Sequence, residues 1–258
     1  MWSRYDDCMK SWLDDLRVAT AFLTRIPMPH PEGARPPNFG RMQRVFPLIG
    51  AAIGALVGLA YLGLLLIGLP VLAAAALAFG ASAILTGGLH EDGLADVADG
   101  FGGGRDKAAK LEIMRDSRLG TYGALILMVS FAAKVSALAV LPMTAVVPAL
   151  VTAHSLARGA LPVFSHSQPR ARNDGLAVAS VRPDSSTMVI AAALALLIVF
   201  LCLPATEALM SAIAGVLGSG SIVLIARQQI GGVTGDVLGA AEQLGETCVL
   251  LVLAARFA

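Results

Sequence analysis

Acidic side chains are concentrated in one short part of a chain that is otherwise mostly apolar. Seven of them lie between residues 87 and 123, beside a run of three glycines and several arginines. Asp92, Asp96 and Asp99 are spaced i, i+4 and i+7, so a helix would carry them along one face. This spacing predicts an acidic stripe on a helix that continues the preceding apolar segment.

A second acidic pair follows the glycine run. Glu112 and Asp116 are spaced i, i+4, and we expect both on the next helix. The glycines at 102–104 have no Cβ atoms, which allows a tight reversal that would bring the two helices together. Like charges held that close repel each other, and a bound divalent cation would relieve the repulsion. Ligand sets made only of oxygen favour Mg²⁺ or Mn²⁺. We therefore expect a metal site formed by Asp92, Asp96, Asp99, Glu112 and Asp116.

Basic and hydroxyl side chains accompany these acids. Metal-binding carboxylates with arginines beside a glycine turn suit a diphosphate substrate, because guanidinium groups clamp phosphate oxygens. The substrate-binding residues expected in this segment are Arg105, Arg115, Ser117 and Arg118. His90 is a candidate general base or phosphate donor, or simply an interfacial side chain. The alternative for the whole segment is a solvated loop of mixed charge.

The remaining sequence predicts the setting of this segment. Apolar residues make up 56% of the 258 residues and charged residues 14%, which is outside the range of an ordinary soluble domain. Residues 45–89 contain no charged side chain, which leaves room for two membrane crossings of about 20 residues each. Further apolar runs lie at 119–141, 144–164, 185–206 and 208–226, and a last one at 247–254 spans only if its helix begins near Asp236. We expect an all-α, polytopic integral membrane bundle with six or seven transmembrane helices rather than a large soluble helical core.

The acidic segment itself cannot lie in lipid. Inserting its seven acids would cost roughly 20 kcal/mol in sum, so the segment must lie at the surface or line a wet cavity. Lys and Arg cluster before residue 45, at 105–118, at 170–182 and at 227, and each cluster is separated from the next by two apolar runs. The positive-inside rule places all of these segments in the cytoplasm, with the active site.

The N-terminal part of the chain has a different pattern. Residues 11–26 have apolar side chains at helical spacing, and Ser11 with Asp14 resembles a capping box. We expect an amphipathic helix that lies flat on the membrane or packs on the membrane domain, followed by a proline-rich linker. This divides the chain into an N-terminal region, 1–40, and a transmembrane catalytic domain, 41–258.

Polar residues also occur inside the apolar runs. Lys134 and Arg158 each require a partner or a cavity, and we expect them to attract an anionic substrate or to pair with each other. Glu246 is a further functional candidate, or a packed, protonated glutamate. Thr234 and Asp236 lie at the expected start of the last helix, whose free N–H groups could hold a phosphate. No aromatic-rich basic patch points to nucleic acid.

Several motifs resemble those of the cobalamin synthase family. They are FLTRIPMP at 22–29, FPLIG at 46–50, GGLHEDGLADVADGFGGG at 87–104, LEIMRDSRLGTYG at 111–123 and GGVTGDVLGAAEQLGE at 231–246. The resemblance implies a Mg²⁺-dependent enzyme of the bacterial inner membrane that joins adenosylcobinamide-GDP to α-ribazole or its 5′-phosphate and releases GMP. It also implies that the ribose 3′-hydroxyl attacks phosphorus in line, and by position Asp116 or Asp99 would take its proton.

A weaker resemblance is to the CDP-alcohol phosphotransferases. Asp96, Asp99 and Gly100 match the first half of their motif, and Glu112 with Asp116 matches the second, although the spacing is shorter and Glu112 replaces an aspartate. Two other functions stay open at this point: a divalent-cation transporter, because intramembrane acids also mark ion paths, and a lipid head-group phosphotransferase. The expected partners are the two small-molecule substrates and membrane lipid. The sequence leaves a homo-oligomer open.

Overall fold

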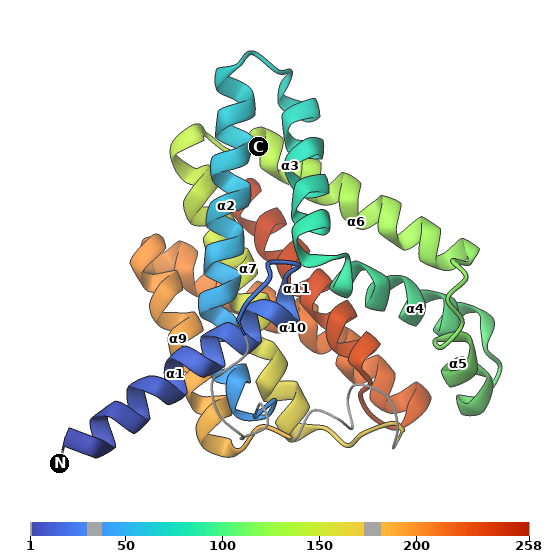
Figure 1. Ribbon diagram of the computed structural model, residues 1–258. Coiled ribbons are helices and arrows are strands. Elements are labelled where there is room, and N and C mark those ends of the chain that lie inside the picture. The colour runs from blue at the N-terminus through green and yellow to red at the C-terminus, as the bar shows by residue number, and fades with distance from the viewer. Residues whose placement is uncertain (1, 30–37, 173–181, 258) are drawn as a thin grey trace.

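The computed structural model describes residues 2–29, 38–172 and 182–257, and for residues 2–10 the backbone alone. Within these ranges the chain is all helical (Figure 1). The elements are α1 (Trp2–Leu23), η1 (Arg41–Val45), α2 (Phe46–Leu66), α3 (Val71–Thr86), α4 (Leu89–Gly103), α5 (Lys107–Ile113), α6 (Thr121–Val140), α7 (Met143–Ser167), α9 (Ser185–Cys202), α10 (Ala205–Ile230) and α11 (Gly235–Ala254).

Six of these helices are long and apolar enough to cross a membrane. They are η1 with α2, and α6, α7, α9, α10 and α11, and the bent pair of α3 and α4 would make a seventh. This confirms the predicted class and the number of crossings. The last apolar run, at 247–254, is too short to cross a membrane unless its helix begins earlier. The helix does begin earlier, at Gly235, as predicted. Most of the proline-rich linker lies outside the described residues.

The sequence predicted that the acidic stripe lies on a continuation of the second apolar helix, and this prediction is wrong. α3 ends at Gly87 and Gly88, which have φ angles of 71° and 68°, and α4 leaves at 93° to it. Only glycine adopts this left-handed backbone without strain. In Figure 1, α4 runs sideways from the foot of α3 towards α5. The break therefore carries the acids out of line with the membrane-crossing helices.

The bundle is packed around α11, which contacts α4, α6, α7 and α10. Small residues allow other helices to approach closely. A Cβ atom added to Gly50 or Gly54 of α2 would lie 2.3 Å from the backbone oxygens of His154 and Leu150 on α7. These contacts hold α2 against α7, and α11 lies behind them in the centre of the molecule (Figure 1).

The N-terminal helix begins at Trp2 rather than at Ser11, so the predicted capping box is wrong. Ser11 instead accepts a hydrogen bond of 2.9 Å from Arg44. Asp15, which is 2% exposed, forms ion pairs with Arg41 (3.0 Å) and Arg44 (2.7 Å). α1 thus packs on the membrane domain through this face, which favours the second of the two placements predicted for it.

Candidate active site

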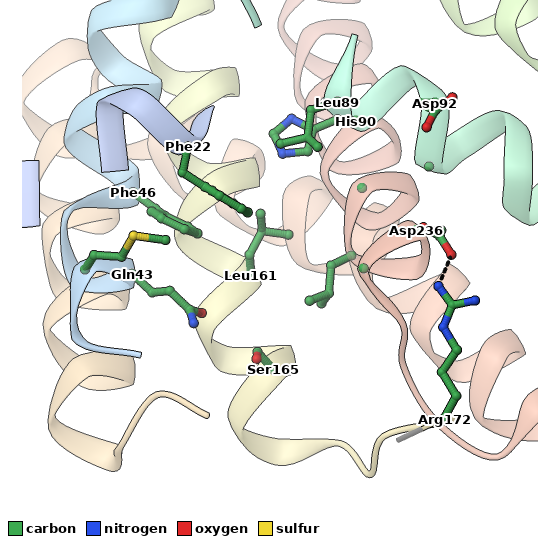
Figure 2. A pocket seen from close by; sticks show the side chains of 15 residues that line it. Phe22, Gln43, Phe46, Leu89, His90, Asp92, Leu161, Ser165, Arg172 and Asp236 are labelled. Carbon is green, nitrogen blue, oxygen red and sulfur yellow. Dashed lines mark hydrogen bonds and ion pairs between the residues drawn. The ribbon is translucent and has the colours of Figure 1, made fainter. Parts of the chain in front are cut away.

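A cavity of about 220 Å³ lies where α4 and the start of α11 meet α1, α2 and α7. Its two sides differ in chemistry (Figure 2). One side is apolar, and its largest groups are Phe22 of α1, Phe46 of α2 and Leu161 of α7, with the two phenyl rings stacked at 6.1 Å. The other side carries Asp92, Asp236 and Arg172. The cavity therefore offers an apolar wall facing a charged one.

The charged wall combines residues from three separate parts of the chain. Asp92 of α4, Arg172 after α7 and Asp236 in the first turn of α11 line it, and Asp96 lies beside it on α4, one turn beyond Asp92. The charges of Asp92, Asp236 and Asp99 all act on Asp96, and Arg172 opposes them. Arg172 donates a hydrogen bond of 3.3 Å from Nη2 to Asp236 Oδ2 (Figure 2). Carboxylates from two helices are thus held close together, and Arg172 lies among them as a counter-charge.

Glycines bring these two helices together. A Cβ on Gly93 of α4 would lie 2.7 Å from the backbone oxygen of Asp236. A Cβ on Gly239 of α11 would lie 3.3 Å from the backbone of His90. The contact between α4 and α11 is therefore backbone to backbone, and it fixes the separation of Asp92 from Asp236.

Asp99 is occupied by the backbone of another helix. Its Oδ2 accepts a hydrogen bond of 2.7 Å from Gly120 N, and its Oδ1 accepts one of 2.9 Å from Gly123 N. These N–H groups belong to the first turn of α6, which has no partner for them within the helix. Asp99 therefore caps α6, a role that the sequence analysis did not assign to it.

The second predicted acidic pair is not part of the cavity wall. α5 ends at Ile113, so Glu112 lies on an exposed helix surface and Asp116 lies in the loop beyond it. Asp116 accepts hydrogen bonds of 3.0 Å from Arg118 Nε, and this interaction lowers the pKa of the Asp116 carboxyl. The prediction of one helix carrying both acids is wrong because the helix is too short.

The predicted arginines beside these acids are also at the surface. Arg105, Arg115, Ser117 and Arg118 are exposed, and none of them lines the cavity. The basic residue that the structure does place there is Arg172, which the sequence analysis counted only as a cytoplasmic charge. Its position, directly after an apolar run and on the same predicted face as the acids, is the signal that could have identified it.

The polar residues inside the spans form one buried network. Arg158 Nη1 lies 2.5 Å from Glu242 Oε1, and His90 Nδ1 lies 3.3 Å from Glu242 Oε2. Arg158 is 1% exposed and lines neither this cavity nor the second one described below, so its predicted role in attracting substrate from a cavity wall is wrong. His90 does line the cavity, which leaves its predicted catalytic role open.

Lys134 and Glu246 complete the network. Lys134 Nζ donates to Gln243 Oε1 at 2.7 Å and to Glu246 Oε1 at 3.2 Å, while His154 Nδ1 lies 2.9 Å from Glu246 Oε2. Lys134 and Arg158 therefore pair with glutamates of α11 and not with each other. His154, Glu242 and Glu246 are close enough to share a metal ion. The two buried cations already balance both carboxylates, so this cluster has no need of one.

The N–H groups at the start of α11 already have partners in the protein: the side chains of Thr234 and Asp236 lie there. Thr234 Oγ1 accepts a hydrogen bond of 3.2 Å from Val237 N and donates one of 3.2 Å to Asp236 Oδ2. A carboxylate in the first turn is favourable at the positive end of the helix dipole. The N-terminus that was predicted to hold a phosphate thus already carries a capping hydroxyl and an aspartate.

Comparisons with known proteins agree with this picture. The family model for cobalamin-5-phosphate synthase matches residues 15–254. The chain is 42% identical over 250 residues to an adenosylcobinamide-GDP ribazoletransferase of Bradyrhizobium diazoefficiens, which covers 96% of both proteins. It is 43% identical over 257 residues to the enzyme of that name from Sinorhizobium medicae, which covers 95% of this chain and 98% of the relative.

No solved structure matches the chain. The resemblance to the CDP-alcohol phosphotransferases is therefore not confirmed, and no comparison supports a cation transporter. The family model and the curated relatives each cover nearly the whole chain, and the family model extends from the second half of α1 to the end of α11. The protein belongs to the cobalamin-5-phosphate synthase family of membrane-embedded transferases.

Proposed function

We propose that the protein is an adenosylcobinamide-GDP ribazoletransferase: it joins adenosylcobinamide-GDP to α-ribazole or α-ribazole 5′-phosphate and releases GMP. The observation that carries this proposal is the charged wall of the cavity. A diphosphate needs positive groups around it, and Arg172 offers a guanidinium in the same wall as carboxylates able to hold a cation. A cavity of about 220 Å³ admits the diphosphate but not a whole corrinoid, which would remain outside it.

The two carboxylates of this wall, together with Asp96 beside them, fit a divalent cation. Asp92, Asp96 and Asp236 offer only oxygen atoms, and their mutual repulsion leaves a negative site that Arg172 alone does not neutralise. We assign Mg²⁺, or Mn²⁺, to these three carboxylates. When bound, such an ion neutralises charge on the diphosphate and makes GMP a better leaving group. Asp99 would support the site from the end of α4 because its own oxygens hold α6.

The reaction itself is a single displacement at phosphorus. The 3′-hydroxyl oxygen of the ribazole forms a bond to the phosphorus next to cobinamide, and the bond from that phosphorus to the GMP oxygen breaks. Arg172 holds a non-bridging phosphate oxygen in place. Neither predicted base is well suited to take the hydroxyl proton, since Asp116 is paired with Arg118 and Asp99 caps α6.

His90 is better placed to accept that proton. It lines the cavity, and its Nδ1 faces the buried carboxylate of Glu242 at 3.3 Å. A carboxylate on one ring nitrogen orients the imidazole and favours protonation of the other. We therefore assign Nε2 of His90 as the acceptor of the hydroxyl proton, with Glu242 as its orienting partner.

The test measures GMP release by the purified protein in lipid nanodiscs. Release should require both substrates and a divalent cation, and Asp96→Asn and Asp236→Asn should each reduce it by orders of magnitude. Glu112→Gln is the matched control, because Glu112 is an exposed acid of α5. Full activity in both aspartate variants would refute the metal assignment. CMP release from a CDP-alcohol, or cation flux without turnover, would refute the proposed function.

A further inference from the structure

His90 lines the cavity of the candidate active site between its two walls. In Figure 2 the rings of Phe22 and Phe46 lie on one side of His90, and Asp92 and Asp236 lie on the other. A hydroxyl that attacks phosphorus and gives its proton to His90 must be in this same cavity. The charged wall is assigned to the diphosphate and its cation, which leaves the apolar wall for the molecule that carries the hydroxyl.

The apolar wall presents an aromatic surface. The rings of Phe22 and Phe46 are within 7° of parallel and their centroids are 6.1 Å apart, which is an offset stack. Leu89, Leu161 and Leu238 line the cavity with them. A further ring packs favourably on aromatic side chains in this way, and stacking of this kind is how proteins bind a base without many hydrogen bonds. The wall therefore fits a planar and largely apolar ring.

Two polar side chains are set in this wall, and Figure 2 shows both below the phenyl rings. Gln43 is 6% exposed and donates a hydrogen bond of 3.2 Å from Nε2 to Phe39 O. The hydroxyl of Ser165 makes no hydrogen bond within the described ranges of the chain. A ring that binds here thus finds one hydroxyl donor and one amide, and little else to pair with its polar atoms.

The proposed reaction involves two aromatic bases, and these polar groups favour one of them. Guanine presents acceptors at N7 and O6 and a donor at N2, and Gln43 and Ser165 cannot pair all of these. A polar group that is buried without a partner is costly. The dimethylbenzimidazole of α-ribazole has one free polar atom on its ring, a nitrogen that accepts a hydrogen bond. The Ser165 hydroxyl can donate to this nitrogen, so the apolar wall matches the benzimidazole.

We propose that the apolar wall binds the dimethylbenzimidazole base of the acceptor, packed on Phe22 and Phe46, with the Ser165 hydroxyl donating to the free ring nitrogen. This inference rests on the proposed function, which supplies the acceptor. With the base in this place, the ribose lies between the two walls and its 3′-hydroxyl faces His90. Phe22 and Asp92 are exposed, so the cavity is open at the surface, and the guanosine and corrinoid of the donor stay outside it.

Phe22→Ala tests the aromatic surface. Phe22 is 37% exposed, so the substitution leaves no closed hole in the core. We expect the KM for α-ribazole to rise about tenfold or more, while the KM for adenosylcobinamide-GDP stays unchanged. Phe22→Trp keeps an aromatic face and should restore the KM for α-ribazole. Phe131→Ala is the matched control and should change neither KM. Phe131 is 42% exposed and lines a second cavity, of about 350 Å³ between α3, α4, α6 and α11, and not the first.

Ser165→Ala tests the hydrogen bond to the ring nitrogen. The probes are 1-methylbenzimidazole and 1-methylindole, which have the same shape, but the indole carries a C–H group where the benzimidazole has its free nitrogen. Equilibrium dialysis against the nanodisc-embedded protein, without donor, measures the binding of each probe. Ser165→Ala should weaken 1-methylbenzimidazole about fivefold and leave 1-methylindole unchanged. Ser167→Ala is the matched control and should weaken neither probe, because Ser167 is an exposed serine of the same helix that does not line the cavity.

Binding and turnover separate this inference from the proposed function. If α-ribazole binds to the wild type and ten times more weakly to Phe22→Ala, but no GMP is released, the base site stands and the proposed function fails. If GMP is released and Phe22→Ala raises the KM for the donor in place of that for α-ribazole, the wall holds the donor and the inference fails. Equal weakening of both probes by Ser165→Ala would also overturn it. Should Phe22→Ala not fold, the comparison of the two probes decides alone.

Discussion

Asp99 at the end of α4 accepts backbone hydrogen bonds from Gly120 and Gly123, and so joins the acidic helix to the first turn of α6. Asp96, one turn earlier, has no such partner among the described residues and lies among like charges. Two aspartates of one stripe therefore have opposite energetic effects on the metal-free fold: Asp99 stabilises it and Asp96 destabilises it.

The first prediction contrasts these two residues. Asp99→Asn replaces one acceptor oxygen by an NH₂ group, and hydrogen bonds to charged groups contribute about 1.5–3 kcal/mol each. We expect Asp99→Asn to lower the thermal unfolding temperature in detergent without Mg²⁺. Asp96→Asn should leave it unchanged or raise it, because it removes repulsion. Added Mg²⁺ should raise the temperature for the wild type and not for Asp96→Asn. Equal destabilisation by both substitutions would contradict this distinction.

The second prediction concerns the contact between α4 and α11. Gly93→Ala places a Cβ atom 2.7 Å from the backbone oxygen of Asp236, so the two helices must move apart. Small misplacements of catalytic groups are costly, and we expect GMP release to fall about 100-fold. Gly220→Ala on α10 is the control, since a Cβ there meets nothing within 4 Å and alanine favours a helix. Wild-type activity in Gly93→Ala would show that the spacing of Asp92 from Asp236 is not critical.

The third prediction concerns the buried pair Arg158 and Glu242, whose side chains are 2% and 0% exposed. Removing one partner leaves a buried charge, which costs about 3–5 kcal/mol, whereas replacing both by apolar groups costs far less. Arg158→Met should therefore reduce the yield of folded protein in membranes more than the double substitution Arg158→Met, Glu242→Met. The double variant should fold but remain inactive, because His90 loses its orienting carboxylate. A double variant less stable than Arg158→Met would contradict the pairing.

The sequence predicted the membrane-crossing helices well because bilayer thickness demands long apolar runs. The ends of α6 lie within two residues of the expected run at 119–141, and the ends of α7 lie within three residues of the run at 144–164. It did not predict the 93° turn at Gly87 and Gly88, because a pair of glycines is also tolerated inside a helix and only the left-handed backbone reveals the break.

The acidic segment shows the limit of spacing arguments. Spacing correctly put Asp92, Asp96 and Asp99 on one helix face, but it could not tell a free carboxylate from one that caps a neighbouring helix. Asp99 and Asp96 look alike in the sequence, and only tertiary contacts separate them. For the same reason nearby Arg118 was predicted at the site in place of Arg172, whose contact with Asp236 joins positions 64 residues apart.

The last prediction concerns the side of the membrane on which the cavity opens. The Lys and Arg distribution predicts that the loop after α4 and the start of α11 face the cytoplasm. Cysteine at Gly102 would collide with the Tyr122 ring, since a Cβ there lies 2.6–2.8 Å from ring atoms. Gly103 and Gly235 are better positions: a Cβ at Gly103 approaches only the end of the Ile113 side chain, at 3.3 Å, and at Gly235 it meets nothing within 4 Å.

The labelling experiment uses a chain without its three native cysteines, Cys8, Cys202 and Cys248. Cysteine at Gly103 or Gly235 should resist a membrane-impermeant thiol reagent added to intact cells and should react once the cells are permeabilised. Ile67→Cys, at the exposed turn between α2 and α3, is the control for the opposite side and should react in intact cells. The charged segments then share one compartment with the nucleotide substrate and with Mg²⁺. Reaction of Gly103→Cys or Gly235→Cys from outside would put the cavity on the wrong side for both, and the proposed orientation would have to be reversed.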